Sequence, residues 1–182
     1  MLMRLLTKAK QKLHSASFVV EMAIVIFVLL FCIALPIVDL ATITLRVSLL
    51  NTCARDAAFH SAKAKTFLSD VSSTSLSAKN LADRIALMEA AAFNDISIDS
   101  VQTYILITNL DTKAVSRQST ILTVAPNTDQ YVYQIEVVVN GRVRPLLLFS
   151  KNWFGDVPGL TDWVRVSVRS REYCENPQGL ML

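Results

Sequence analysis

The chain has 182 residues, of which 52% are hydrophobic and only 18% are charged, so it is more apolar than an ordinary soluble domain. Its formal net charge of +3 originates in the first sixteen residues, which contain four basic residues and no acid, whereas the rest of the chain is nearly neutral. The sequence has no basic patch with interleaved aromatic residues, so we expect no nucleic-acid partner. The four basic residues are Arg4, Lys8, Lys10 and Lys12.

The apolar excess lies in one segment, Phe18–Leu40. A membrane-spanning helix needs about 20 mainly apolar residues, because each adds about 1.5 Å and the hydrocarbon core is about 30 Å thick. The run Met22–Val38 carries no charge, which favours a spanning helix over the core helix of a soluble domain. A cleaved secretory signal is the weaker alternative, because its apolar region is shorter and ends in small residues.

The basic leader sets the orientation of this helix. Positive charge stays on the cytoplasmic side of a membrane, and Arg46 is the first basic residue after the apolar run. We therefore expect a single-pass protein of the bacterial inner membrane, with a cytoplasmic N-terminus and an extracytoplasmic C-terminal domain. The lipid bilayer is its first expected partner.

Two acidic residues stand near the ends of the apolar segment. Asp39 is interpreted as marking the outer edge of the bilayer, because an acid costs roughly 2.5–3.5 kcal/mol at the centre of a spanning helix and less towards the interface. Glu21 lies near the inner boundary, where an acid complements the dipole of the helix N-terminus.

The surroundings of Glu21 suggest a more specific role. The basic leader is followed by SASFVVEMAIVIFVLL, and LNTCARDAAFHSA follows the apolar run at 50–62. Together these segments resemble the N-terminal signature of TadE/TadF-like minor pilins of the tight-adherence (Tad) pilus. In that family a prepilin peptidase cuts on the cytoplasmic side, after a small residue that is usually Gly, and the fifth mature residue is Glu.

The resemblance implies cleavage between Ala16 and Ser17, with Ala16 in place of the usual Gly and Glu21 as the fifth mature residue. It also implies a pilin-like fold. The implied partners are other pilin or pseudopilin subunits, the Tad assembly machinery and the prepilin peptidase. Cleavage would create a positive α-amine one helical turn from Glu21, and the two charges could pair within a subunit or between subunits.

Beyond the bilayer the helix is predicted to continue, so that one long, bent helix runs from Ser17 to about Leu68. Pro36 removes a hydrogen bond and is expected to kink it. Residues rich in Ser and Thr then predict a loop over Ser69–Ser77. Four-residue spacing predicts one packing stripe beyond the membrane, made of Leu45, Leu49, Cys53 and Ala57, with Leu50 and Ala54 beside it.

The later sequence predicts an α+β domain, with helices packed on one antiparallel sheet. Asn140-Gly141 favours a type I′ turn between strands Tyr131–Val139 and Arg142–Phe149, and Pro145 indicates that the second of these is an edge strand. Val and Arg or Ser alternate in DWVRVSVRSREY (162–173), as in a half-exposed strand. Other predicted elements are a helix with Leu81, Ile85, Met88 and Ala92 on one face, and strands at Ile96–Thr108 and Ser119–Val124.

The sequence contains no catalytic constellation, so we expect neither an enzyme nor a cofactor. His60 is the only histidine in the exported part, which excludes a histidine-based metal cluster, and it is interpreted as a helix-surface or packing residue. Phosphate-binding glycine loops and hydrolase motifs are also missing. Scattered acids such as Asp95, Asp99, Asp111 and Asp129 are expected to be solvated.

Cys53 and Cys174 would both lie in an oxidising compartment, where a disulfide can persist. Two interpretations remain open for them. A bridge would tie the C-terminal tail to the long helix and add about 2–4 kcal/mol of stability; otherwise they are two independent buried thiols. Cys32 lies in the membrane helix and is interpreted as a small apolar residue.

Four segments follow from these patterns: a basic cytoplasmic leader (1–16), a transmembrane helix (17–40), its extracytoplasmic continuation (41–68) and an exported α+β domain (69–182). The favoured function is a pilin-like structural or assembly subunit. The alternative is an uncleaved, signal-anchored sensor or binding protein, in which Glu21 has no special role. A membrane-tethered enzyme is disfavoured because no site is present.

Overall fold

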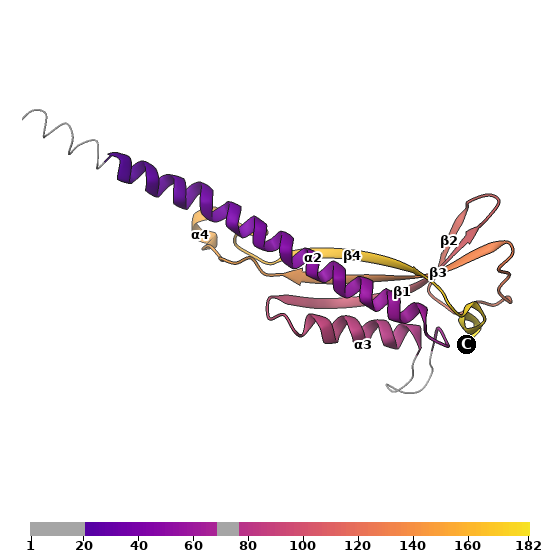
Figure 1. Cartoon of the computed structure of the whole chain (residues 1–182). Coiled ribbons are helices and arrows are strands. Elements are labelled where there is room, and N and C mark those ends of the chain that lie inside the picture. The colour runs from indigo at the N-terminus through magenta and orange to yellow at the C-terminus, as the bar shows by residue number, and fades with distance from the viewer. Residues whose placement is uncertain (1–20, 69–76) are drawn as a thin grey trace, which may run out of the picture.

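A computed structural model describes residues 21–68 and 77–182 (Figure 1). The predicted leader, the Ala16–Ser17 bond and most of the predicted loop at 69–77 lie outside these residues. The described part is α+β: two helices pack on a four-stranded antiparallel sheet, and one of them is a long helix whose N-terminal part projects beyond the sheet.

The long helix runs without interruption from Glu21 to Ala62. It contains a π-helical turn at Leu30–Ala34, in which the Leu35 N–H donates to the Leu30 carbonyl, and then the α-helix α2 (Leu35–Ala62). The π turn directly precedes Pro36, which has no N–H to donate and whose ring would clash with a carbonyl in a regular α-helix. A widened turn in this place accommodates Pro36.

The helix ends at Ala62, so the prediction that it reaches about Leu68 is wrong. The N–H groups of Lys63 and Ala64 donate to carbonyls only three residues back, which closes the last turn. The chain then bends so that Phe67 is fully buried and its N–H donates to the carbonyl of Leu182 at 2.9 Å. The burial of this phenylalanine stabilises the bend.

Helix α3 (Ala78–Ala90) begins at Ser77, whose side chain accepts a hydrogen bond from the Asn80 N–H at 3.4 Å. The face predicted for this helix is only partly confirmed: Leu81 and Ile85 are half-buried, whereas Met88 is 63% exposed and Ala92 lies beyond the end of the helix. The core instead takes one alanine stripe from each helix, which allows the helices and the sheet to approach closely. The stripes are Ala54, Ala57, Ala58 and Ala62 on α2, and Ala78, Ala82, Ala86 and Ala90 on α3.

The sheet has the order β2-β1-β3-β4, and all neighbouring strands are antiparallel. Helix α2 contacts β3 and β4, and α3 contacts β1, so both helices cover one face (Figure 1). The strands are β1 (Ile96–Asn109), β2 (Val115–Gln118), β3 (Tyr131–Val143) and β4 (Val164–Tyr173), and the short helices are α4 (Lys151–Phe154) and the 3₁₀ helix Pro177–Met181.

The predicted hairpin at Asn140-Gly141 does not form, because both residues belong to the continuous strand β3. Gly141 pairs with Ile98 on one side and with Val166 on the other. A Cβ atom on Gly141 would lie 2.7 Å from the Ser97 carbonyl oxygen and 3.4 Å from Leu50 Cδ2. Glycine is needed here for close packing of backbone and helix and not for a turn.

The predictions for the outer strands have mixed outcomes. Strand β1 is confirmed to within one residue, and β4 is confirmed as a half-exposed antiparallel strand whose residues alternate between half-buried and exposed. Strand β4 forms one edge of the sheet. Pro145 lies after β3 and outside any strand, so its assignment to an edge strand is wrong. The strand expected at Ser119–Val124 is also wrong, because the strand that follows β1 is β2 at Val115–Gln118.

Candidate functional site

The N-terminal half of the long helix has an apolar surface that the domain leaves largely uncovered. Glu21 is the first described residue and is exposed. The helix is long and apolar enough to cross a membrane. Apolar side chains with about half of their surface exposed extend from Met22 to Ile33: Met22, Ile24, Val25, Ile26, Phe27, Val28, Leu29, Leu30, Phe31 and Ile33. A continuous apolar surface of this extent marks contact with lipid or with another protein.

Asp39 joins the helix to the domain. Its carboxylate is 1% exposed, and Oδ1 accepts hydrogen bonds from the backbone N–H groups of Leu146 at 2.6 Å and Leu147 at 3.2 Å. The other oxygen, Oδ2, is buried and accepts no hydrogen bond from any described residue. Asp39 therefore binds a loop of the domain, a role that the sequence did not indicate. We call this contact the Asp39 clamp.

Arg46 makes a second contact about two helical turns further along α2. It forms an ion pair with Asp95 at 2.5 Å, just before β1, and donates to the Arg144 carbonyl just after β3. Asp95 is also 4.0 Å from the Arg144 guanidinium. The expectation that Asp95 is merely solvated is therefore wrong. Together, the Asp39 clamp and Arg46 fix the helix against the ends of two central strands.

Glu136 is a buried acid on the sheet face opposite the helices, and sequence reasoning missed it. It is 1% exposed, and its carboxylate lies 2.6 Å from Arg117 of β2 and 2.9 Å from Arg171 of β4. The Arg117 guanidinium also stacks 3.5 Å from the Tyr104 ring. The sequence signal for it was weak: an acid within a run of β-branched residues, with alternating arginines in a later strand.

Arginines from three strands gather on this open sheet face, although no basic cluster is visible along the sequence. They are Arg117, Arg142, Arg165, Arg169 and Arg171. Glu136 pairs with two of them, and Asp99 pairs with Arg142 at 2.8 Å. Asp99 was also expected to be only solvated. Charge-assisted pairs of this kind link neighbouring strands.

The structure keeps Cys53 and Cys174 apart as free thiols. Cys53 lies nine residues before Ala62 on α2, or about 13 Å along the helix. The residue after Cys174, Glu175, donates its N–H to the Ala62 carbonyl at 3.0 Å. A disulfide needs Cα atoms within about 7 Å, so the two are not placed to bridge. Burial, reinforced by the nearby Glu89 carboxylate, raises the pKa of the Cys53 thiol to about 11.

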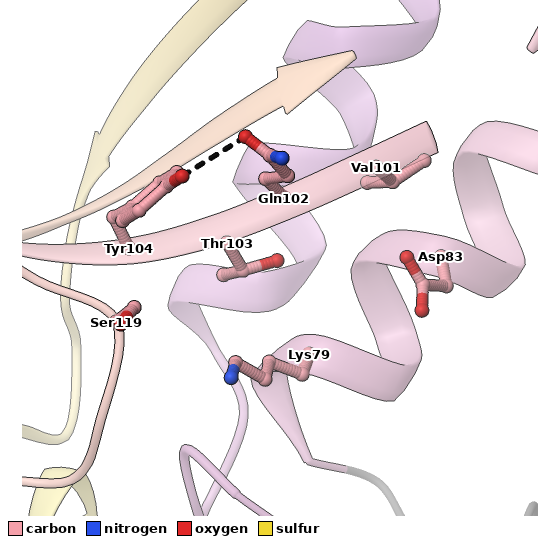
Figure 2. Close-up of a pocket in the computed structure, with 7 residues that line it drawn as sticks. All are labelled: Lys79, Asp83, Val101, Gln102, Thr103, Tyr104 and Ser119. Carbon is pink, nitrogen blue, oxygen red and sulfur yellow. Dashed lines mark hydrogen bonds between the residues drawn. The ribbon is translucent and has the colours of Figure 1, made fainter. Parts of the chain in front are cut away.

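A polar hollow of about 250 Å³ lies between α3 and the edge of β1 (Figure 2). Lys79 and Asp83 project towards it from α3, and Tyr104 donates to the Gln102 side chain at 2.9 Å on the strand side. Burial raises the pKa of the Asp83 carboxyl, and Lys79 partly opposes that shift. Among the described residues, no acid or base that lines this hollow is hydrogen-bonded to a nucleophilic side chain.

The other candidate groups do not assemble into a site. His60 is exposed at the end of α2 and packs edge-on against the Phe59 ring. Within residues 21–68 and 77–182, no group of three potential ligands could hold a metal ion. The apolar helix and its two contacts with the domain are thus the features that carry functional information.

Comparisons of the chain with protein-family models, with curated proteins and with solved structures found no match. Its function is therefore inferred from its own residues and geometry.

Proposed function

We propose that this protein is a pilin-like structural or assembly subunit of a Tad-type pilus or secretion apparatus. It is inserted in the bacterial inner membrane with its N-terminus in the cytoplasm. A prepilin peptidase cuts it between Ala16 and Ser17, and the mature chain associates with other pilin or pseudopilin subunits.

The division of the long helix is the observation that carries this proposal. Its N-terminal half exposes most of its apolar side chains, whereas one face of α2 from Leu50 onward is buried in the core of a small α+β domain. A plain anchor needs only the first half and a flexible connection. A rigid helix that continues into the core instead couples the membrane segment to the domain, as an assembling subunit requires.

Glu21 gives the exposed half its specificity in this proposal. Cleavage before Ser17 would place a positive α-amine about one turn from the carboxylate, on the same face of a helix. At about 4 Å and an effective dielectric constant near 20, the attraction is of order 4 kcal/mol, which desolvation partly offsets. The pairing lowers the free energy of a carboxylate at membrane depth, and a neighbouring subunit's amine can satisfy it equally well.

The mass of the protein isolated from membranes tests the processing step. In the wild-type strain, we expect the mass of a mature chain that begins at Ser17. In a strain that lacks the prepilin peptidase, we expect the mass of the full chain with its leader. An intact N-terminus in both strains would contradict the proposal and favour an uncleaved, signal-anchored sensor or binding protein.

Substitution of Glu21 tests the assembly step separately. Glu21→Leu should leave the protein in the membrane but stop its incorporation with other subunits, as measured by co-purification. Leu29→Ala is the matched control, because it changes an exposed apolar side chain on the same helix without altering charge. Normal co-purification of Glu21→Leu would refute the role of the carboxylate.

A further inference from the structure

The segment Pro145–Leu160, between β3 and β4, has a composition unusual for a surface loop. Eight of its sixteen residues are Leu, Phe, Trp or Val, and its only charged residues are Lys151 and Asp156. Those two form an ion pair at 2.9 Å. Half of the segment is therefore made of large apolar residues, and its net charge is zero.

The segment lies against the apolar helix and not against the body of the domain. The Asp39 clamp holds its first residues, and from there it extends back along the helix, with α4 beside the N-terminal part of the helix (Figure 1). Phe149 and Leu160 line one cavity together with Phe27 and Phe31 of the helix. Phe31 is eight residues before Asp39, or about 12 Å nearer the N-terminus.

This position matters because the helix residues beside the segment belong to the stretch expected to cross the bilayer. If Phe18–Leu40 spans the hydrocarbon core, the level of Phe31 lies inside the leaflet on the domain side. The segment must then contact lipid at that level.

The exposed side chains fit such a contact. Leucines at 146, 147 and 148 are 51%, 38% and 44% exposed, and Val157 is 44% exposed. They continue the apolar surface of the helix, where Ile37 is 61% and Leu40 is 64% exposed. In water this combined surface would be a liability, whereas in a leaflet it is stabilising.

Part of the backbone of the segment is hydrogen-bonded, which favours contact with a medium without water, where each unsatisfied polar group costs several kcal/mol. The Asp39 clamp accepts from two consecutive N–H groups. Further along, Phe149 donates to the Leu160 carbonyl at 2.9 Å and Gly155 donates to the Lys151 carbonyl at 2.9 Å. Lys151 also lies 3.5 Å from Asp162, and its long side chain can reach the headgroup level.

We propose that Pro145–Leu160 is a second membrane-contacting element, which inserts beside the helix into the leaflet on the domain side and is covered by lipid acyl chains. The proposal rests on the membrane anchoring in the proposed function and is independent of cleavage and assembly. A second copy of the chain is the competing occupant of the same surface.

Depth-dependent quenching in vesicles tests this. The full chain with its three native cysteines replaced by alanine receives one new cysteine, as Leu147→Cys, Ile37→Cys or Val124→Cys, each labelled with an environment-sensitive nitrobenzoxadiazole dye. The proteins are reconstituted in phosphatidylglycerol–phosphatidylcholine vesicles that contain acyl-chain nitroxide lipids. Val124 is the matched control, since it is 75% exposed and apolar but lies in the β2–β3 connection, at the opposite end of the sheet from α4 (Figure 1).

The expected result is a blue-shifted, strongly quenched dye at Leu147→Cys, as at Ile37→Cys, and an unquenched dye at Val124→Cys. Quenching at Ile37→Cys alone would overturn the second contact while leaving the anchor intact. No quenching at any position would overturn the anchor itself. A blue shift at Leu147→Cys that is not quenched and vanishes at low protein-to-lipid ratio would assign the surface to a second copy and also overturn the proposal.

A second measurement avoids the cysteine replacements. The chain has two tryptophans, so Trp163→Phe leaves Trp153, within the segment, as the only one. Lipids brominated on the acyl chains should quench its fluorescence in vesicles. An unchanged fluorescence would contradict insertion even if the cysteine-free protein failed to fold.

Discussion

Replacing Asp39 by alanine should release the loop at Leu146 and Leu147. The carboxylate accepts two charge-assisted hydrogen bonds, at 2.6 and 3.2 Å, while 1% exposed. Hydrogen bonds to charged groups contribute about 1.5–3 kcal/mol each, and the longer one contributes less. The sum is about 2–4 kcal/mol, which corresponds to a roughly 30- to 1,000-fold increase in local opening. Asp39 is expected at the outer edge of the bilayer, where water can bond the released N–H groups once the loop opens, so the effect should be local and not global.

Amide hydrogen exchange measures this opening residue by residue. Faster exchange at residues 146–148 is expected in Asp39→Ala, with unchanged exchange in β1 and β3. Asp39→Asn keeps an acceptor oxygen without the charge, so its exchange rates at these residues should lie between those of the wild type and Asp39→Ala. Thr42→Ala is the control, because the Thr42 hydroxyl donates only to the Val38 carbonyl of the same helix. Unchanged exchange at Leu146 and Leu147 in Asp39→Ala would refute the clamp.

Three further changes test other contacts. Glu136→Ala should lower the free energy of unfolding, measured by denaturant unfolding in detergent, by about 1–3 kcal/mol. This is less than for a fully buried pair, because both arginines are half-exposed. Arg169→Ala is the control, and an equal loss of stability in both variants would contradict the ion-pair account. Gly141→Ala should lower the free energy of unfolding by about 1–3 kcal/mol and lower Tm, because the new Cβ would lie 2.7 Å from a carbonyl oxygen. An unchanged Tm would show that the strand shifts freely and would contradict this prediction. The pKa of the Cys53 thiol is 9.0 in the unfolded chain and about 11 in the folded chain, so the free energy of unfolding should fall as pH rises from about 9 to 11. Unfolding curves measured over a pH series should show a smaller fall in Cys53→Ala. An equally steep fall in the variant would assign it to other groups.

The sequence predicted those features whose signals are local and strong. A long apolar run needs a long helix, and the alternation of Val164, Val166 and Val168 with polar residues needs a strand with one covered face. The turn after β1 also depends on a local signal: the Asn109 side chain accepts hydrogen bonds from the backbone N–H groups of Asp111 and Thr112, at 2.9 Å each. These features depend on neighbours within a few residues.

The features that were missed depend on distant partners. Asn140-Gly141 has a strong turn preference, but pairing on both sides of β3 overrides it. Met88 was placed on the same face as Ile85 but is exposed, because close packing selects small side chains and a stripe of alanines has only a weak apolar signal. Glu136 finds its arginines 19 residues earlier and 35 residues later, on strands whose register the sequence does not specify.

The alanine stripes have a mechanical consequence. Alanine has no rotamers to rearrange, and closely packed interiors are poorly compressible, so the helix pair and the sheet behave as one stiff body. Helix α2 runs alongside β3 and β4, so tension along the helix loads many contacts in shear at once, instead of separating them one after another (Figure 1). A protein built in this way transmits a pull on its membrane segment to the far end of its domain with little extension.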